Sequence, residues 1–77
     1  MLRTKTIRQE IREQVKLLPA REAEILSMRF GLDGNPAQTL EEVGRKFKVT
    51  RERIRQLQDL ALQKLRRRLE SLDVGQS

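Results

Sequence analysis

The residues from Thr50 to Gln56 have the types and the spacing needed to read DNA. If they begin a helix, Arg51 and Arg55 lie four residues apart, as do Glu52 and Gln56, so they form one compact polar patch. Arg, Glu and Gln are side chains that hydrogen-bond to base edges in the major groove. Thr50 stands where an N-cap belongs, and Glu52 lies in the first turn, where the helix dipole favours a carboxylate. The stretch therefore predicts a recognition helix whose first turns enter DNA.

Each polar side chain near this helix start has a role that fits its chemistry. Arg51 suits a guanine, Glu52 can accept from a cytosine amino group, and Gln56 suits an adenine or a neighbouring base. Phosphate contacts are expected from the cations beside them, which are Lys46, Lys48, Arg53 and Arg55. Backbone N–H groups at Thr39 and Leu40 can hold a further phosphate if a helix begins there. The alternative for Glu52 is an ion pair with a nearby Arg.

The positive charge is concentrated in the second half of the chain. Residues 45–68 hold ten Lys and Arg against Glu52 and Asp59, whereas residues 1–38 hold seven against five Asp and Glu. A localised basic segment indicates a polyanionic partner, of which nucleic acid is the commonest. A solvated helix face is the alternative, and it is the preferred interpretation for Arg66, Arg67 and Arg68.

The composition excludes several kinds of site. The 77 residues include no Cys and no His, which removes disulfides, thiolate chemistry and nearly all transition-metal sites. No nucleophile–base pair and no phosphate-loop lysine is visible, so we expect neither an enzyme nor a cofactor. No apolar run is long enough to span a membrane, and the N-terminus lacks the apolar core of a signal peptide.

Two amphipathic helices are expected in the first half of the chain. Residues 2–17 carry apolar residues at helical spacing, with charged residues between them. A second helix is expected to start at Pro19, which is well tolerated in a first turn, and to end at Gly31. Residues 31–36 have the composition of a loop.

Two further helices are expected in the second half. Thr39 and Glu42 have the spacing of a capping box, which predicts a helix start at Thr39. The last helix is expected from Thr50 through Leu72, and residues 73–77 are expected to form a frayed end.

A short turn around Lys48 and Val49 joins these two helices, so together they are typical of a helix-turn-helix. Gly44 is expected where the helices cross, and Ile54 and Leu57 are expected to anchor the second against the first. The predicted fold is all-α. It is a small four-helix domain with a C-terminal helix-turn-helix of the winged-helix-like class, over residues 1–77 as a single unit.

Two long segments of the chain resemble a known family. The segment from Thr39 to Gln56 resembles the most characteristic part of region 4 of bacterial sigma factors, in the housekeeping (sigma-70) group and its close relatives. The segment from Leu18 to Leu32 is similar to the preceding half of that domain, so residues 1–38 correspond to region 4.1 and residues 39–72 to the helix-turn-helix. The resemblance covers residues 7–68.

The resemblance implies a promoter-recognition domain that binds the −35 element, of consensus TTGACA, while held on RNA polymerase. The implied partners are double-stranded promoter DNA and the polymerase core, and the implied location is the bacterial cytoplasm, with a plastid homologue left open. The family's base readers fall on Arg51, Glu52 and Gln56, and its phosphate contacts fall on Arg53, Arg55 and the start of the Thr39 helix.

The family also implies a groove for the flap-tip helix of the polymerase β subunit. The residues expected there are Ile25, Phe30, Leu32 and Leu65, each of which has ordinary core packing as its alternative. Where members usually continue Ile-Glu-Ala-Lys, this chain has Leu57, Gln58, Asp59 and Leu60. Leu60 in this stretch, and Gln63 three residues after it, replace basic residues of the family that often contact activators.

Two other classes of function remain open from the sequence. One is a protein-interaction module bound mainly by a transcription activator or an anti-sigma factor. The other is a free-standing helix-turn-helix regulator, which would need a dimer face; the stripe of Leu65, Leu69 and Leu72 could supply one.

Overall fold

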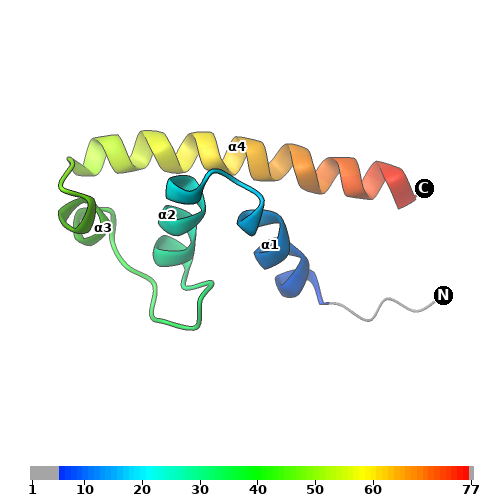
Figure 1. The fold of residues 1–77 in the computed structure, drawn as a ribbon, viewed down its shortest axis with the longest axis horizontal. Helices are drawn as coiled ribbons and strands as arrows, with labels where there is room; N and C mark the ends of the chain where they lie inside the picture. Colours follow the sequence, from blue (N-terminus) through cyan, green and yellow to red (C-terminus); the bar gives the residue numbers. More distant parts are fainter. Residues whose placement is uncertain (1–5, 77) are drawn as a thin grey trace.

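The computed structural model describes the backbone of residues 6–76 and the side chains of residues 6–71. Over that range the chain forms α-helices and no strand, in the order α1 (Ile7–Lys16), α2 (Ala20–Phe30), α3 (Leu40–Phe47) and α4 (Arg51–Gln76). The long α4 contacts each of the other three helices. These helices lie along one side of α4 in the order α3, α2 and α1, from its N-terminal end towards its C-terminal end (Figure 1). This arrangement confirms the predicted all-α class. No helix among the described residues has the length and apolar character to cross a membrane.

Threonine residues cap three of these helices. In each case the threonine Oγ1 accepts the backbone N–H three residues on at 3.1 Å, and the pairs are Thr6–Gln9, Thr39–Glu42 and Thr50–Arg53. In α1 and α3 the third residue also reaches back: Gln9 Oε1 and Glu42 Oε1 each accept the N–H of the capping threonine at 2.8 Å. The capping box predicted at Thr39 is therefore present, and a second one, with a glutamine in place of the glutamate, begins α1.

The observed helix ends differ from the predicted ones in three places. Thr6 has extended backbone angles, so α1 begins at Ile7 rather than at residue 2, and residues 1–5 lie outside the described part of the chain. Pro19 is the N-cap of α2 rather than its first helical residue. The backbone of α4 continues to Gln76, so the segment expected to be frayed is helical up to that residue, and Ser77 is outside the description.

The core consists of two clusters of buried residues, and α2 and α4 contribute to both. The first cluster contains Val15, Leu18, Leu26, Ala61 and Leu65. The second cluster contains Ile25, Met28, Val43, Ile54 and Leu57. The first joins α1 to the middle of α4, and the second joins α3 to the beginning of α4. One apolar stripe of α4 thus holds both halves of the domain, as its helical spacing predicts.

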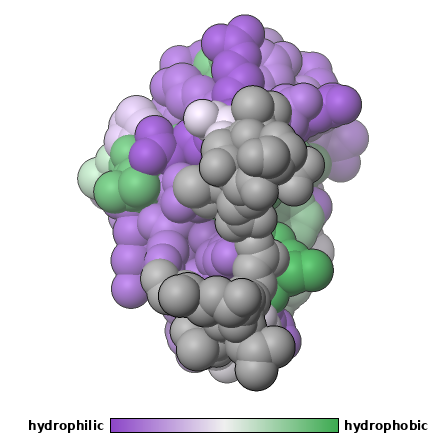
Figure 2. Space-filling view, turned by 90° about the vertical axis from the view of Figure 1, so that its right-hand side faces the viewer, coloured by the Kyte–Doolittle hydropathy of each residue, from purple (hydrophilic) through white to green (hydrophobic). Residues whose placement is uncertain are grey.

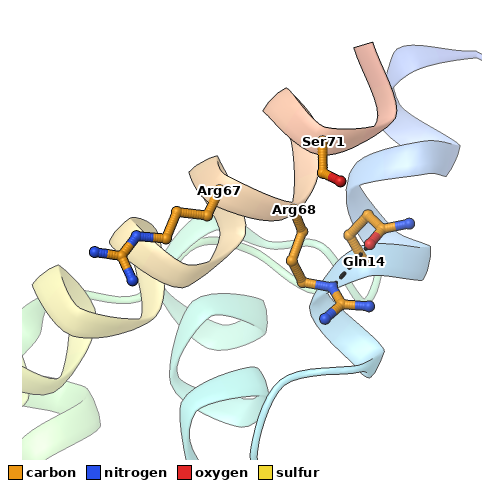
Figure 3. Close-up of a pocket in the computed structure, with 4 residues that line it drawn as sticks. All are labelled: Gln14, Arg67, Arg68 and Ser71. Carbon is orange, nitrogen blue, oxygen red and sulfur yellow. Dashed lines mark hydrogen bonds between the residues drawn. The ribbon is translucent and has the colours of Figure 1, made fainter. Parts of the chain in front are cut away.

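Polar contacts fasten the second half of α4 to α1 and α2. Lys64 Nζ on α4 lies 2.9 Å from a carboxylate oxygen of Glu22 on α2. Arg68 Nε donates to Gln14 Oε1 on α1 at 2.9 Å, at a shallow pocket that Arg67 and Ser71 also line (Figure 3). The surface at this end of the molecule is largely hydrophilic, with separate hydrophobic areas at its two sides (Figure 2). These contacts keep the C-terminal half of α4 aligned with the rest of the domain.

Candidate nucleic-acid interface

The turn between α3 and α4 consists of residues 48–50 and sets the angle of the candidate recognition helix. Lys48 closes α3 in the left-handed conformation, with φ 60° and ψ 41°, where helices most often have a glycine. The N–H of Val49 donates to the carbonyl of Gly44 at 2.9 Å, and Thr50 then caps α4. Both α3 and α4 bury residues in the second core cluster. The predicted helix-turn-helix is therefore formed, with Lys48 in the place of the usual glycine.

The three residues predicted to read bases lie together on the first two turns of α4. Arg51, Glu52 and Gln56 are all exposed. Behind them, Ile54 is fully buried and Leu57 is 8% exposed, and both pack against α3 in the second core cluster. The helix therefore has the apolar back and polar front that the sequence predicts, while the base contacts themselves stay a prediction.

Ion pairs on this polar front link Glu52 to Arg55 and Arg55 to Asp59. Two nitrogens of Arg55 reach the Glu52 carboxylate, with Nε 3.1 Å from Oε1 and Nη2 2.5 Å from Oε2. The remaining nitrogen, Nη1, donates to Asp59 Oδ2 at 2.8 Å. The hydrogen bond from Arg55 lowers the pKa of Glu52 below its usual value of 4.5 and raises the pKa of Arg55. The alternative considered for Glu52, pairing with a nearby Arg, is thus present in the structure.

A second contact joins a predicted phosphate ligand to a predicted base reader. Arg53 Nη1 donates to Gln56 Oε1 at 3.4 Å, a long hydrogen bond between two exposed side chains. Lys46 and Lys48 are exposed on the last turn and the C-cap of α3, directly before the turn that leads into α4. The side chains predicted to bind phosphates in the turn and in early α4 are therefore all exposed.

The start of α3 offers fewer free N–H groups than the sequence predicts. The N–H of Thr39 donates to the Glu42 carboxylate, and the N–H of Glu42 donates to the Thr39 hydroxyl. Leu40 and Glu41 are the first-turn residues whose N–H groups a helix leaves without an intrahelical acceptor. Of the two residues predicted to bind a phosphate here, Leu40 can offer its backbone N–H, whereas Thr39 already uses its own.

Arg29 also shapes this surface, although no pattern in the sequence marks it as functional. It projects from α2, and its Nε donates to Gln58 Oε1 on α4 at 2.8 Å. Its Nη1 donates to the carbonyl of Gln38, immediately before α3, at 2.6 Å. Arg29 thus ties the beginning of α3 to α4 across α2. No periodic signal could have revealed it, because its partner on α4 is 29 positions away in the chain.

The four residues expected to line a polymerase groove do not form one exposed surface. Ile25 is fully buried in the second core cluster, and Leu65 is buried in the first. Leu32 is partly buried against the first cluster, and only Phe30, with 45% of its area exposed, is open to a partner. Ordinary core packing, the alternative considered for each residue, therefore describes Ile25 and Leu65.

The leucine stripe considered for a dimer face also packs within the domain. Leu65 belongs to the first core cluster and Leu69 packs against it. The side chain of Leu72 lies outside the described residues. The described part of the stripe is therefore used to hold α1 and α2 against α4.

A helix-turn-helix with an exposed row of Arg, Glu and Gln on its second helix is the architecture of a DNA-binding domain. Comparison with known proteins gives the family. The family described as "Sigma-70, region 4" matches residues 15–67, so the chain belongs to the sigma-70 region 4 family, a DNA-binding rather than a catalytic family. This confirms the resemblance seen in the sequence.

Two curated relatives illustrate the similarity. The chain is 60% identical over 55 residues to "RNA polymerase sigma factor RpoD" of Neisseria gonorrhoeae, an alignment that covers 71% of this chain and 9% of that protein. It is 52% identical over 60 residues to "RNA polymerase sigma factor SigA" of Lactococcus lactis subsp. cremoris, covering 78% of this chain and 16% of the relative. The chain thus spans a small part of the length of these sigma factors.

Proposed function

We propose that this domain recognises the −35 element of bacterial promoters for transcription initiation, and that it does so while docked on the β-subunit flap of RNA polymerase in the cytoplasm. The observation that carries the proposal is the exposed row of Arg51, Glu52 and Gln56 above the buried Ile54. Membership of the sigma-70 region 4 family supports the same assignment.

In this proposal α4 enters the major groove with its first two turns. Arg51 donates to guanine O6 and N7, Glu52 accepts from a cytosine amino group, and Gln56 contacts an adenine or a neighbouring base. Arg53, Lys46 and Lys48 contact phosphates on either side of the groove, which fixes the register of the helix without reading sequence. The buried contacts of Ile54 and Leu57 with α3 hold the helix at the angle that the turn sets.

The flap contact in this proposal uses the surface around Phe30. Phe30 is the exposed member of the expected set, and Arg29 stacks on its ring with the guanidinium carbon 5.5 Å from the ring centroid. Leu32 lies partly buried nearby in the chain, so the two residues offer an apolar contact beside the α2 C-terminus. Ile25 and Leu65 support this region from the core rather than by direct contact.

A protein-interaction module remains the second candidate, and one observation favours it. Leu60 on α4 is 47% exposed at a position where the family usually has a cation. A leucine there can make an apolar contact with an activator or an anti-sigma factor, but not the ionic contact that a cation would make.

The discriminating experiment measures binding of the 77-residue chain to labelled duplexes by fluorescence anisotropy. One duplex carries an intact TTGACA element and the other carries the same bases in scrambled order. We expect tighter binding to the intact element at every salt concentration, with a clear fall in affinity as salt rises. Footprinting with and without core polymerase then tests the docked state. Equal affinity for both duplexes, with tight binding to a flap-tip peptide, would favour the interaction module.

A further inference from the structure

The guanidinium of Arg55 is held from two directions along α4. Glu52, one turn before it, accepts hydrogen bonds from Nε and Nη2. Asp59, one turn after it, accepts a hydrogen bond from Nη1. All three side chains are about half exposed, with 48% of Arg55, 59% of Glu52 and 48% of Asp59 accessible. The network therefore lies on the surface that the proposed function assigns to DNA, and it uses all the nitrogens of Arg55.

We propose that Asp59 is a positioning residue that holds Arg55 against Glu52, so that Glu52 is presented in one conformation as a base acceptor and Arg55 is withheld from phosphates. This inference rests on the proposed function, since it concerns the same surface. It assigns a role to Asp59, and it changes the role expected of Arg55 from a phosphate contact to a support for Glu52.

Charge and geometry both favour this role. A free Glu on an exposed helix samples several rotamers, and binding to a base would have to fix one of them. The two bonds from Arg55 fix the plane of the Glu52 carboxylate before DNA arrives. Without Asp59, the Nη1 group of Arg55 would have its N–H donors free for a phosphate, and a guanidinium binds phosphate well.

The net charge of these three side chains also supports the positioning role of Asp59. Glu52, Arg55 and Asp59 together carry one negative charge, so this part of the helix gains nothing from the sequence-independent attraction of DNA. Among the residues that the structure describes, Arg51 and Arg53 form no ion pair and remain available to bases and phosphates. Asp59 therefore lowers the sequence-independent affinity of this surface for DNA and raises its discrimination between bases.

A double-mutant cycle tests this role. The variants are Asp59→Ala, Arg55→Ala and the double variant, and Glu70→Ala is the matched control because it removes one exposed carboxylate from α4 away from the network. Glu52→Ala first identifies the base pair of the −35 duplex that Glu52 reads. Discrimination at that base pair and the salt dependence of binding are then measured for each variant, after a circular-dichroism melt shows that it is folded.

We expect Asp59→Ala to lower discrimination at that base pair by about 1.4- to fivefold, the range for exposed ion pairs. The slope of log affinity against log salt should steepen by about one as Arg55 gains a phosphate. Glu70→Ala should change neither quantity, and Asp59→Ala should have no further effect once Arg55 is alanine. If Asp59→Ala acts equally with and without Arg55, it acts by simple repulsion of DNA and the positioning role is wrong.

A measurement on the free protein separates this inference from the proposed function. The relaxation of the Arg55 Nε–H group should show a rigid side chain in the wild type and a mobile one in Asp59→Ala. If the wild type prefers the intact duplex but the effects of Asp59→Ala and Arg55→Ala simply add in the double variant, only the role of Asp59 is overturned. A wild type without any preference between duplexes overturns the proposed function and this inference together, whatever the relaxation shows.

Discussion

The carbonyl oxygen of Val49 lies 2.8 Å from the point where a Cβ on Gly44 would stand. The N–H of the same Val49 donates to the Gly44 carbonyl at 2.9 Å, so the turn closes directly over the glycine. Thr50 and Arg51 backbone atoms lie within 3.5 Å of the same point. A side chain at Gly44 would therefore press on backbone atoms of the turn. The close crossing of α3 and α4 depends on the absence of a side chain at this position.

Gly44→Ala should destabilise the domain. The added methyl forces the turn outwards, and overpacking of this kind costs about 1–3 kcal/mol. Alanine recovers about 1 kcal/mol because it is a better helix former than glycine. We expect a net loss of up to about 2 kcal/mol in a urea denaturation experiment. Lys46→Ala, an exposed change on the same helix, is the control and should be nearly neutral. A Gly44→Ala variant as stable as the wild type would show that the turn can yield.

Lys48→Gly should separate stability from DNA binding. Lys48 is the non-glycine residue with positive φ in the described chain, and a left-handed residue costs about 1–2 kcal/mol. Glycine removes that strain but adds roughly 0.4–1 kcal/mol of unfolded-state entropy, so we expect stability to rise by up to about 1.5 kcal/mol. Losing the cation should weaken binding to intact and scrambled duplexes alike.

Lys46→Ala again provides the comparison for Lys48→Gly. It removes a neighbouring charge without changing a left-handed residue, so it should weaken binding without raising stability. If Lys48→Gly is less stable than the wild type, the strain at Lys48 is smaller than the entropy that glycine adds.

The features that could be predicted from the sequence are those set by neighbours within four residues. The Thr39 capping box, the Thr50 cap and the glycine end of α2 all depend on local hydrogen bonds, and all three are present. The polar front and apolar back of early α4 follow from helical spacing in the same way. Family resemblance added the assignment to sigma region 4, which the comparisons confirm.

Contacts between distant segments could not be predicted in this way. Arg29 with Gln58, and Glu22 with Lys64, join residues 29 and 42 positions apart, and no local pattern marks them. Helical spacing also identifies an apolar face without saying what covers it. For Ile25 the sequence left two interpretations, a polymerase groove implied by the family and ordinary core packing, and the side chain is fully buried in the domain's own core.

Acid should weaken the start of α3 but not the start of α1. Hydrogen bonds with Thr39, from its backbone first and its side chain second, lower the pKa of Glu42 below the usual 4.5. A lowered folded-state pKa means that Glu42 stabilises the fold fully above the unfolded-state pKa. This contribution is lost as the pH falls through the folded-state value. The box in α1 uses Gln9, which does not titrate.

We therefore expect Glu42→Gln to flatten part of the fall in stability from about pH 5 downwards, measured by denaturation at a series of pH values. The reciprocal variant Gln9→Glu should add acid sensitivity at α1. Some acid sensitivity will remain in Glu42→Gln, because the pKa values of Glu52 and Asp33 are also lowered. Parallel pH profiles for wild type and Glu42→Gln would mean that the carboxylate adds nothing beyond an amide at this cap.

Arg53 and Gln56 touch each other, yet their substitution should have different effects on DNA binding. Gln56→Ala removes a base contact, so it should cost about 1–3 kcal/mol on the intact −35 duplex and little on the scrambled one. Arg53→Ala removes a phosphate contact, so it should weaken binding to both duplexes and reduce the salt slope by about 0.9. Anisotropy titrations at several salt concentrations measure both quantities. Because Arg53 Nη1 also reaches Gln56 Oε1, a small loss of discrimination in Arg53→Ala is consistent with its role. A loss as large as that of Gln56→Ala is not, and it would place Arg53 among the base readers.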